Sequence, residues 1–244
     1  MKKIIRSFFQ QFGYDIVKYR PPFVRGRTDR EGFIAEHKWL QAYHFNTIID
    51  IGANEGQFSD KMRILFPHAM IFAFEPLPMV FERLKFNFSG DKTFEAINLG
   101  LGENEGMIEF WENDYSPSSS FLRLTETHKQ NFEEARIENK IEVKIDKLDK
   151  VLGESNIQSP VLVKIDVQGF EDKVIRGGEN IIRKADMVIC ELSFTELYKG
   201  QPLFADIFRQ FQDLGFYFAG QLDQISSPDT QKPLQADGIF LKKS

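Results

Sequence analysis

The segment Thr47–Gly56, which reads Thr-Ile-Ile-Asp-Ile-Gly-Ala-Asn-Glu-Gly, constrains the fold of this chain more than any other stretch. Its apolar run is typical of a buried strand, and Gly52 and Gly56 predict a turn directly after it. Apolar residues then recur at helical spacing until Pro67, which ends a predicted helix. A strand, a glycine turn and a helix together make a place for a nucleotide-like ligand. Glycines let the backbone come close, and a helix N-terminus presents free N–H groups.

The rest of the chain repeats this alternation of strands and helices. Besides the strand that begins at Thr47, the pattern predicts strands over Met70–Phe74, Thr93–Ile97, Val161–Ile165, Met187–Cys190, Phe216–Ala219 and Gly238–Leu241. Helices are expected over Glu31–Tyr43, Met79–Phe88, Val174–Ile182 and Pro202–Leu214. The predicted fold class is α/β: an open, Rossmann-like sheet, mostly parallel with a closing antiparallel strand, and helices on both faces.

The chain divides into an extension and a domain. Residues 1–46 are predicted to be an N-terminal helical extension, followed by a domain over 47–244 with an insertion at about 102–147. At the start, Met1–Phe12 combines basic residues with aliphatic and aromatic residues at helical spacing. Such a helix would associate weakly with an acidic lipid surface, or would pack on the domain or on a second subunit. We favour packing.

The insertion contains elements of its own. A short hairpin is expected between Ile108–Trp111 and Ile141–Ile145, and the polar segment Thr125–Asn139 has helical character. Between them, the serine-rich loop 116–120 fits a flexible linker and a substrate lid equally well.

The composition excludes several classes of protein. The formal net charge of -5 argues against nucleic acid as the partner. No run approaches the roughly 20 apolar residues that span a membrane. The single cysteine, Cys190, cannot form an intramolecular disulfide, which fits a reducing, cytoplasmic location. The 25 phenylalanines fit either a homodimer contact or a well-filled core.

Glu75 is a candidate ligand-binding residue because of its distance from the glycine turn. It follows the predicted strand Met70–Phe74 and lies 25 residues after Asp50. In nucleotide-binding folds, an acid about 20 residues beyond the turn, at the tip of the next parallel strand, accepts hydrogen bonds from a ribose diol. Pro76 and Pro78 also suit a helix start, where an acid is favoured. The spacing makes ligand binding the preferred interpretation.

The glycine spacing selects among nucleotide-like ligands. The dinucleotide fingerprint Gly-x-Gly-x-x-Gly, counted from Gly52, needs glycine where Asn54 and Gln57 stand. The pattern present, Asp50-x-Gly52-x-x-x-Gly56, resembles that of class I methyltransferases that bind S-adenosylmethionine. That ligand has no pyrophosphate, so the middle glycine is not needed. An NAD- or nucleotide-sugar-binding enzyme of similar fold is the alternative.

Further segments make the resemblance more specific. Five of them, in chain order, are similar to the sequence blocks of the FkbM family of methyltransferases: Ile49–Gly56, Ala73–Pro76, Val163–Glu171, Cys190-Glu191 and Ala236–Phe240. The resemblance covers about residues 46–241. One departure is Gln168-Gly169, where the family block has Glu-Gly. The resemblance implies O-methyl transfer to a hydroxyl, commonly of a sugar or a polyketide, and it does not fix the acceptor.

The resemblance also implies roles for residues at the strand ends. Asp50 and the glycine turn would hold the methionine part of the cofactor, and Glu75 would hold its ribose. The cofactor-binding residues that we expect are Asp50, Gly52, Ala53, Asn54, Gly56, Glu75, Pro76, Asn98 and Asp166. Several carboxylates at one rim of a sheet are costly unless they meet hydroxyls, ammonium groups, cations or protons.

Methyl transfer from a sulfonium requires alignment of donor and acceptor, together with a base for the acceptor hydroxyl. Asp166 is the expected catalytic base or orienting residue, with Glu171 and Glu191 as second candidates. Glu171, in the first turn of a predicted helix, also fits a helix-start acid. Asp166 and Glu191 could instead bind Mg²⁺, which takes carboxylate oxygens. We do not favour a metal, because no further ligand is identifiable from the spacing.

The predicted function is therefore S-adenosylmethionine-dependent O-methylation of a hydroxyl on a sugar, a glycan or a related small acceptor. A non-catalytic cofactor-binding scaffold is a second alternative. The intact residues Asp50, Gly52, Gly56 and Glu75 argue against loss of the pocket, although not against loss of turnover.

Overall fold

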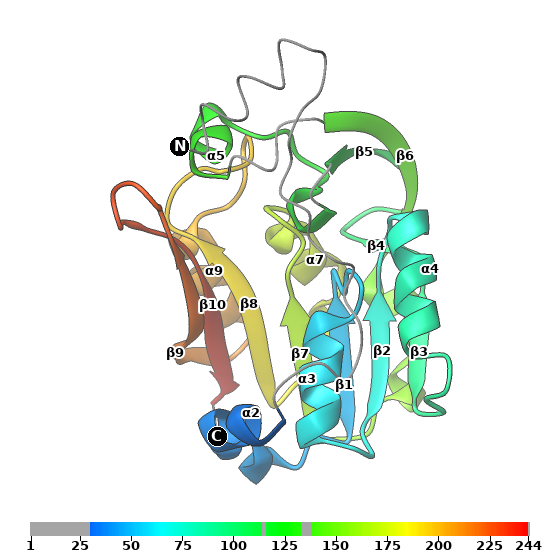
Figure 1. Cartoon of the computed structure of the whole chain (residues 1–244). Coiled ribbons are helices and arrows are strands. Elements are labelled where there is room, and N and C mark those ends of the chain that lie inside the picture. The colour runs from blue at the N-terminus through cyan, green and yellow to red at the C-terminus, as the bar shows by residue number, and fades with distance from the viewer. Residues whose placement is uncertain (1–29, 114–115, 133–137, 244) are drawn as a thin grey trace.

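The computed structural model describes residues 30–113, 116–132 and 138–243 (Figure 1). At the centre lies a seven-stranded sheet with the strand order β3-β2-β1-β7-β8-β10-β9. The strands of this sheet are β1 (Thr47–Ile51), β2 (Met70–Phe74), β3 (Phe94–Ile97), β7 (Val161–Ile165), β8 (Met187–Ser193), β9 (Phe216–Ser226) and β10 (Pro233–Lys242). The predicted segment Met1–Phe12 lies outside the described residues.

Strand direction confirms the predicted class of sheet. The five strands from β3 to β8 pair in parallel, and β10 runs antiparallel to both of its neighbours. The strand order reverses between β1 and β7. In that register Asp50 of β1 lies opposite Ala73 of β2 on one side and Lys164 of β7 on the other. Ligands of open α/β sheets bind beside such a reversal, at the carboxyl ends of the strands.

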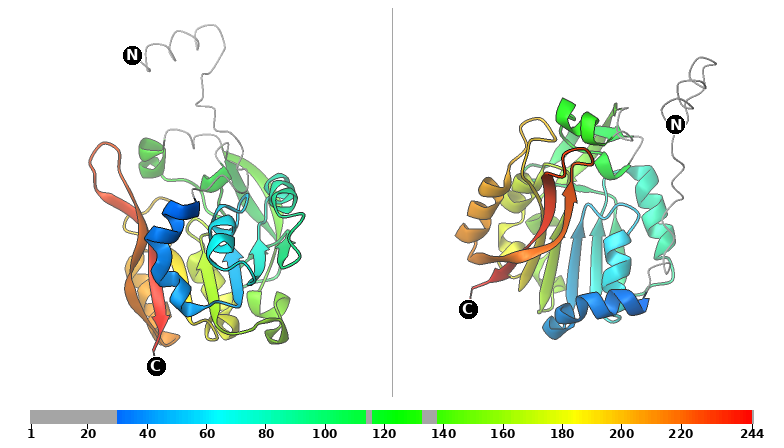
Figure 2. Two further views of the ribbon diagram at one scale, coloured as in Figure 1. Left: turned by 60° about the horizontal axis from the view of Figure 1, so that its bottom comes forward. Right: turned by 60° about the vertical axis from the view of Figure 1, so that its left-hand side comes forward.

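Helices cover both faces of the sheet (Figure 2). On one face, Ile48, Ile71 and Leu162 pack against a layer that includes Met62 and Leu65. That face is covered by α2 (Arg30–His37), the 3-10 helix η1 (Lys38–Tyr43), α3 (Gln57–Leu65) and α4 (Pro78–Asn87). The other face is covered by α6 (Leu148–Val151), α7 (Glu171–Gly177), α8 (Glu179–Ile182) and α9 (Phe204–Asp213). Because both faces are covered, the parallel strands are almost continuously apolar, which is why the sequence indicates them clearly.

Together with β4, which directly precedes it, the insertion forms a second, three-stranded sheet with the order β4-β6-β5. Its strands are β4 (Gly100–Leu101), β5 (Gly106–Asn113) and β6 (Glu138–Asp146), and the antiparallel pairing of β5 with β6 confirms the predicted hairpin. The prediction of a helix over Thr125–Asn139 is wrong at its end. Helix α5 (Glu126–Asn131) is short, and the last predicted residues, Glu138 and Asn139, pair with β5. Two short 3-10 helices complete the elements: η2 (Ser116–Ser118) and η3 (Glu154–Asn156).

Three strands of the central sheet extend beyond their predicted ends. Strand β8 continues to Ser193, so Glu191 lies inside the strand and not at its end. Strands β9 and β10 are each longer than predicted and form a projecting hairpin (Figure 1). The added residues of β9 alternate between half-buried and exposed positions. They contain no continuous apolar run, so the pattern under-predicts the strand.

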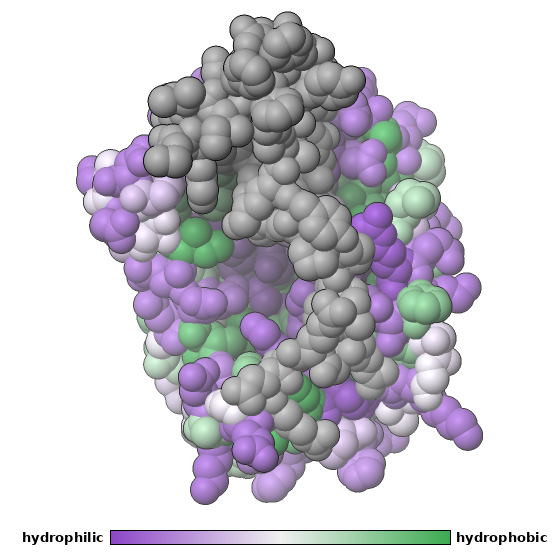
Figure 3. All heavy atoms as spheres, in the orientation of Figure 1, coloured by the Kyte–Doolittle hydropathy of each residue, from purple (hydrophilic) through white to green (hydrophobic). Residues whose placement is uncertain are grey.

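Phenylalanines fill the core rather than gather on the surface. Phe74, Phe211, Phe216 and Phe240 are all at most 1% exposed. In Figure 3, hydrophilic side chains make up most of the coloured part of the face shown, with smaller apolar areas between them. Core packing therefore accounts for many of these residues, and a homodimer stays a prediction.

Candidate active site

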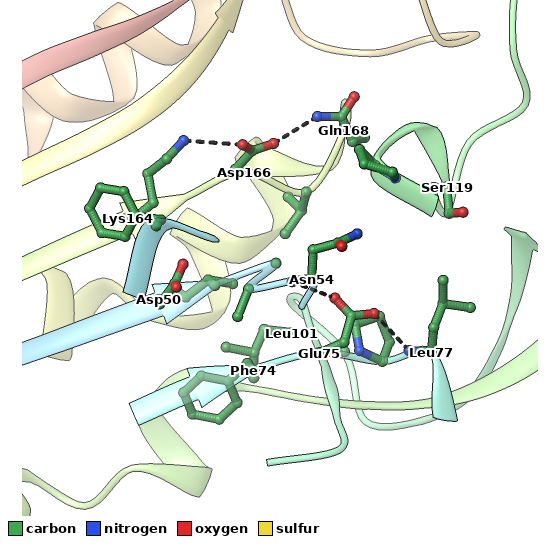
Figure 4. A pocket seen from close by; sticks show the side chains of 18 of the residues that line it. Asp50, Asn54, Phe74, Glu75, Leu77, Leu101, Ser119, Lys164, Asp166 and Gln168 are labelled. Atoms are coloured by element: carbon green, nitrogen blue, oxygen red, sulfur yellow. Dashed lines mark hydrogen bonds and ion pairs between the residues drawn. The ribbon is translucent and has the colours of Figure 1, made fainter. Parts of the chain in front are cut away.

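A cavity of about 350 Å³ opens at the carboxyl ends of β1, β2 and β7 (Figure 4). The β1–α3 turn and the segments after β2 and β7 form three of its walls, and the insertion forms another. Of the residues predicted from the sequence, the cavity is lined by Asp50, Gly52, Ala53, Asn54, Glu75, Pro76 and Asp166. Four predicted residues do not line it: Gly56, Asn98, Glu171 and Glu191.

Glu75 lies at the end of β2 and is held by two backbone donors. The N–H of Asn54 donates to Oε2 and the N–H of Leu77 donates to Oε1, each at 2.9 Å. Burial raises the pKa of Glu75 to about 7, although these two N–H bonds work in the opposite direction. Each carboxylate oxygen keeps a lone pair, so the side chain can accept further hydrogen bonds from a diol in the cavity.

Asn98 supports this segment from behind. Its Nδ2 donates to the backbone oxygens of Glu75 at 2.8 Å and of Pro76 at 3.0 Å. Because these bonds fix the chain directly after β2, Asn98 orients the Glu75 carboxylate without lining the cavity itself. The expected contact of Asn98 with the cofactor stays a prediction, because this residue lies behind the cavity wall.

The glycines of the β1–α3 turn are explained by close packing. Gly52 has a φ of +81°, and a Cβ there would overlap the backbone oxygen of Asp166. Gly56 has a φ of +97°, and a Cβ there would overlap the ring of Phe88. Glycine is thus required at both positions, by the neighbouring strand end for Gly52 and by helix α4 for Gly56.

Within the β1–α3 turn itself, the backbone N–H groups of residues 52–56 all donate to acceptors inside the protein. The N–H groups of Gly52 and Ala53 donate to the oxygen of Phe74 at 3.0 and 2.9 Å. Those of the next three residues donate to Glu75, to the Asn54 side chain and to Ala53. The predicted N–H donors belong to the first residues of α3, and Gln57 and Phe58 there line the cavity, as does the exposed Lys61 of the same helix.

Asp50 is buried inside β1, one residue before the strand ends. The Ser59 hydroxyl of α3 donates to its Oδ2 at 2.6 Å. Burial raises the pKa of Asp50 to about 6, against the opposing effects of the Ser59 hydrogen bond and the Lys164 charge. Its carboxylate can meet an ammonium group of a ligand, because one face of the side chain lines the cavity.

Asp166 belongs to an ion-pair network that sequence reasoning missed. Lys164 Nζ contacts Asp166 Oδ2 at 3.2 Å and Asp237 Oδ1 at 2.8 Å. Burial works to lower the pKa of Lys164, but the two carboxylates outweigh it and raise that pKa well above its usual range. A lysine inside the apolar run Val161–Ile165 was the available signal, since a buried charge must be paired.

The two second candidates for the base are buried beside the cavity. Glu171 Oε1 accepts the N–H groups of Val167 and Gly169, both at 3.1 Å, and so holds the loop after β7. Burial raises the pKa of Glu171 to about 7. Burial, and then the nearby Asp166 and Glu171 carboxylates, raise the pKa of Glu191 well above its usual range.

The serine-rich loop contributes to the cavity. Ser116, Pro117 and Ser119 line it, and Asn54 Nδ2 donates to Ser116 Oγ at 3.2 Å. Figure 4 shows Ser119 on the wall beside Gln168, and Ser119 is only 8% exposed. This position favours a role in the site over a flexible linker.

The residues of the cavity fit a ligand that carries a diol, an aromatic base and a zwitterionic tail. Glu75 can accept from the diol, and Asp50 with Lys61 can meet the two charges of the tail. Phe74, Leu101 and other apolar side chains line the remaining surface, which suits a base.

Comparison with known proteins adds independent findings. A family described as the methyltransferase FkbM domain matches residues 50–218. The 2-O-methyltransferase NoeI of Sinorhizobium fredii is 30% identical over 160 residues, which are 63% of this chain and 66% of NoeI. The hexuronic acid methyltransferase AglP of Haloferax volcanii is 29% identical over 170 residues, which are 69% of this chain and 63% of AglP. The chain thus spans a little under two thirds of these curated relatives.

Among solved structures, a magnesium protoporphyrin IX methyltransferase from Synechocystis, determined with bound SAH, aligns over 100% of both chains. It is 13% identical, with a TM-score of 0.46.

Proposed function

The chain belongs to the FkbM methyltransferase family, and we propose that it transfers a methyl group from S-adenosylmethionine to a hydroxyl of a sugar, a glycan or a related small acceptor. The names of the two curated relatives support this proposal. One is named for 2-O-methylation and the other for methylation of a hexuronic acid.

The position of the Glu75 carboxylate is the observation that best supports the proposal. It is a buried carboxylate at the end of β2, it is held by the β1–α3 turn, and it lines the cavity. A ribose diol supplies two hydroxyl donors to such an acid, and Asn54 and Gln57, which stand where the dinucleotide fingerprint needs glycine, disfavour a ligand with a pyrophosphate. We therefore assign the ribose to Glu75, the ammonium group to Asp50 and the carboxylate to Lys61.

When bound, S-adenosylmethionine supplies a methyl group that its sulfonium already activates. The chain then has to align the acceptor and to take its hydroxyl proton. We assign the proton to a carboxylate oxygen of Asp166, whose side chain is 34% exposed at the cavity and is held by Lys164. Glu171 and Glu191 receive no proton transfer in this proposal, because neither lines the cavity.

The proposed location is the cytoplasm. Cys190 is a buried free thiol, and burial raises its pKa well above its usual range. Such a cysteine is an unreactive core residue, and it needs no oxidising compartment. Separately, none of the described helices has the length and apolarity required to cross a bilayer.

Calorimetric titration of S-adenosylhomocysteine tests the cofactor assignment. Wild type should bind, and E75Q should bind at least about tenfold more weakly, because the amide replaces two acceptor oxygens with one. Glu82, on the exposed face of α4, provides the matched control E82Q, which should bind like wild type. Absence of binding by wild type would refute the proposal, and equal binding by E75Q would refute the role of Glu75.

The acceptor is tested with radiolabelled S-adenosylmethionine and cell-envelope glycans. Label should enter the glycan fraction with wild type, and mass spectrometry should find the added methyl group on a sugar oxygen. D166N should still bind the cofactor but should lose about 100-fold or more of the transfer rate, as expected for removal of a general base. Transfer by D166N at the wild-type rate would assign the proton to another group.

A further inference from the structure

The side-chain amide of Gln168 lies between two carboxylates. Its Nε2 donates to Asp166 Oδ1 at 2.7 Å and to Glu191 Oε2 at 3.0 Å. Its Oε1 accepts from the hydroxyl of Tyr198 at 2.6 Å. These three bonds determine the orientation of the amide, because the reversed group would turn its carbonyl oxygen toward both carboxylates. Figure 4 shows Lys164, Asp166 and Gln168 in a continuous chain along one wall of the cavity.

The backbone of Gln168 is held in an unusual conformation. Its φ is +56°, in the left-handed region that residues other than glycine rarely adopt. The Ser120 hydroxyl donates to its backbone oxygen at 2.6 Å, and Glu171 accepts the N–H groups of the residues on either side. Such a conformation persists only where the surroundings hold it, and its presence at a site suggests a function.

The placement of the Gln168 amide between Asp166 and Glu191 has an electrostatic reason. Asp166 and Glu191 are close neighbours, and Glu191 is only 8% exposed. The buried cation of this region, Lys164, pairs with Asp166 and Asp237. Glu191 instead receives its hydrogen bond from the amide. Two neighbouring carboxylates, of which Glu191 is buried and Asp166 is partly exposed, need a proton, a cation or N–H donors between them.

We propose that the Gln168 amide takes the position that a divalent cation would otherwise occupy between Asp166 and Glu191, and that it orients Asp166 toward the acceptor without a metal ion. Gln168 is thus a positioning residue, which acts through Asp166. Its role in orientation rests on the methyl transfer proposed above, whereas the bridge between the carboxylates does not. The proposal also decides against the Mg²⁺ alternative, on the ground that an amide fills the position between the two carboxylates.

The matched substitution Gln168→Glu tests the proposal directly. It puts a third carboxylate between the other two and keeps the length of the side chain. In EDTA, Q168E should melt roughly 4 °C or more below wild type, and millimolar MgCl₂ should restore most of that loss. Calorimetry with MnCl₂ should detect one site in Q168E and none in wild type. The control is Q212E, on the exposed face of α9, which should respond to neither cation.

A second variant keeps the test decisive if Q168E does not fold. Q168M keeps the length of the side chain but removes both the donors and the acceptor, so its melting temperature should fall. Adding E191Q removes one of the two carboxylate charges, and Q168M/E191Q should recover at least half of that fall. A residue with only a packing role would show neither this recovery nor a new cation site.

Activity separates this proposal from the proposed function. EDTA should leave wild-type label transfer to glycans unchanged, and Q168E should need MgCl₂ for transfer. The proposal that the Gln168 amide bridges Asp166 and Glu191 would be refuted by stoichiometric MnCl₂ binding to wild type. It would also be refuted if a folded Q168E ignored cations, or if Q168M/E191Q were no more stable than Q168M. Failure of wild type to bind S-adenosylhomocysteine would refute the proposed function alone, because the melting and MnCl₂ measurements need no cofactor.

Discussion

Glu75→Gln is expected to change how the stability of the folded chain depends on pH. Burial raises the pKa of Glu75 from 4.5 to about 7. A raised pKa means that the folded chain binds this proton more tightly than the unfolded chain does. The stability that the protonated form contributes is therefore fully present below pH 4.5, and it is lost as the pH rises through about 7.

The size of the effect follows from this difference. The rise in the pKa of Glu75 from 4.5 in the unfolded chain to about 7 in the folded chain corresponds to about 3 kcal/mol of unfolding free energy. Glutamine does not titrate, so this loss is absent in E75Q. However, the new amide turns an NH₂ group toward one of the two backbone donors, Asn54 or Leu77, which costs about 1–3 kcal/mol at every pH. E75Q should thus be less stable than wild type at about pH 5, and equal or more stable at about pH 8.

Urea unfolding followed by circular dichroism, at several values between about pH 5 and about pH 8, measures this change. The quantity of interest is the difference in unfolding free energy between wild type and E75Q. Asp50 and Glu171 have raised pKa values as well, and they titrate in both proteins. The exposed control E82Q should follow wild type throughout. A wild-type minus E75Q difference that stays constant within about 0.5 kcal/mol over this range would refute the reasoning.

Three further substitutions test the supports of the site. Gly52→Ala would drive a Cβ into the backbone oxygen of Asp166, so urea unfolding should report a loss of about 3 kcal/mol or more, whereas Gly90→Ala, at an open position, should be neutral. Asn98→Ala removes two hydrogen bonds and should cost about 1–2 kcal/mol, with weaker S-adenosylhomocysteine binding in calorimetry; unchanged binding would mean that Glu75 is oriented without it. Arg63→Met removes the ion pair with Asp91 and the hydrogen bonds to four backbone carbonyls, so thermal unfolding should show a loss of about 3–5 kcal/mol, and a loss below about 1 kcal/mol would contradict that account.

The parallel half of the fold could be predicted from local patterns. Val161–Ile165 and Met70–Phe74 match their strands residue for residue, because a strand covered on both faces must be apolar almost throughout. Glu75 could be found by spacing, since it directly follows a predicted strand. The projecting hairpin could not be predicted in full, because its outer residues are polar on one side and pair mainly with each other.

The errors at the site have a common origin in contacts between distant segments. The N–H groups of Gly52, Ala53 and Asn54 donate to Phe74 and Glu75, which belong to the end of the next strand and the residue after it. Glu191 was expected at a strand end, but pairing with Asp237 continues β8 past it. The local sequence around Gly52 does not show that Phe74 and Glu75 will accept its hydrogen bonds. The local sequence around Glu191 does not show that Asp237 will pair with it.

The sequence by itself determined the class of sheet, the places of its strands along the chain and most of the acids at its rim, because apolar periodicity and turn glycines are local properties. Only the tertiary structure decided which charges meet. Lys164 pairs with Asp237 across 73 residues of chain, and the amide of Gln168 comes to lie between Asp166 and Glu191. The energy of a buried charge depends on its neighbours in space and on its distance from water, and both are set by packing between segments that are remote in sequence.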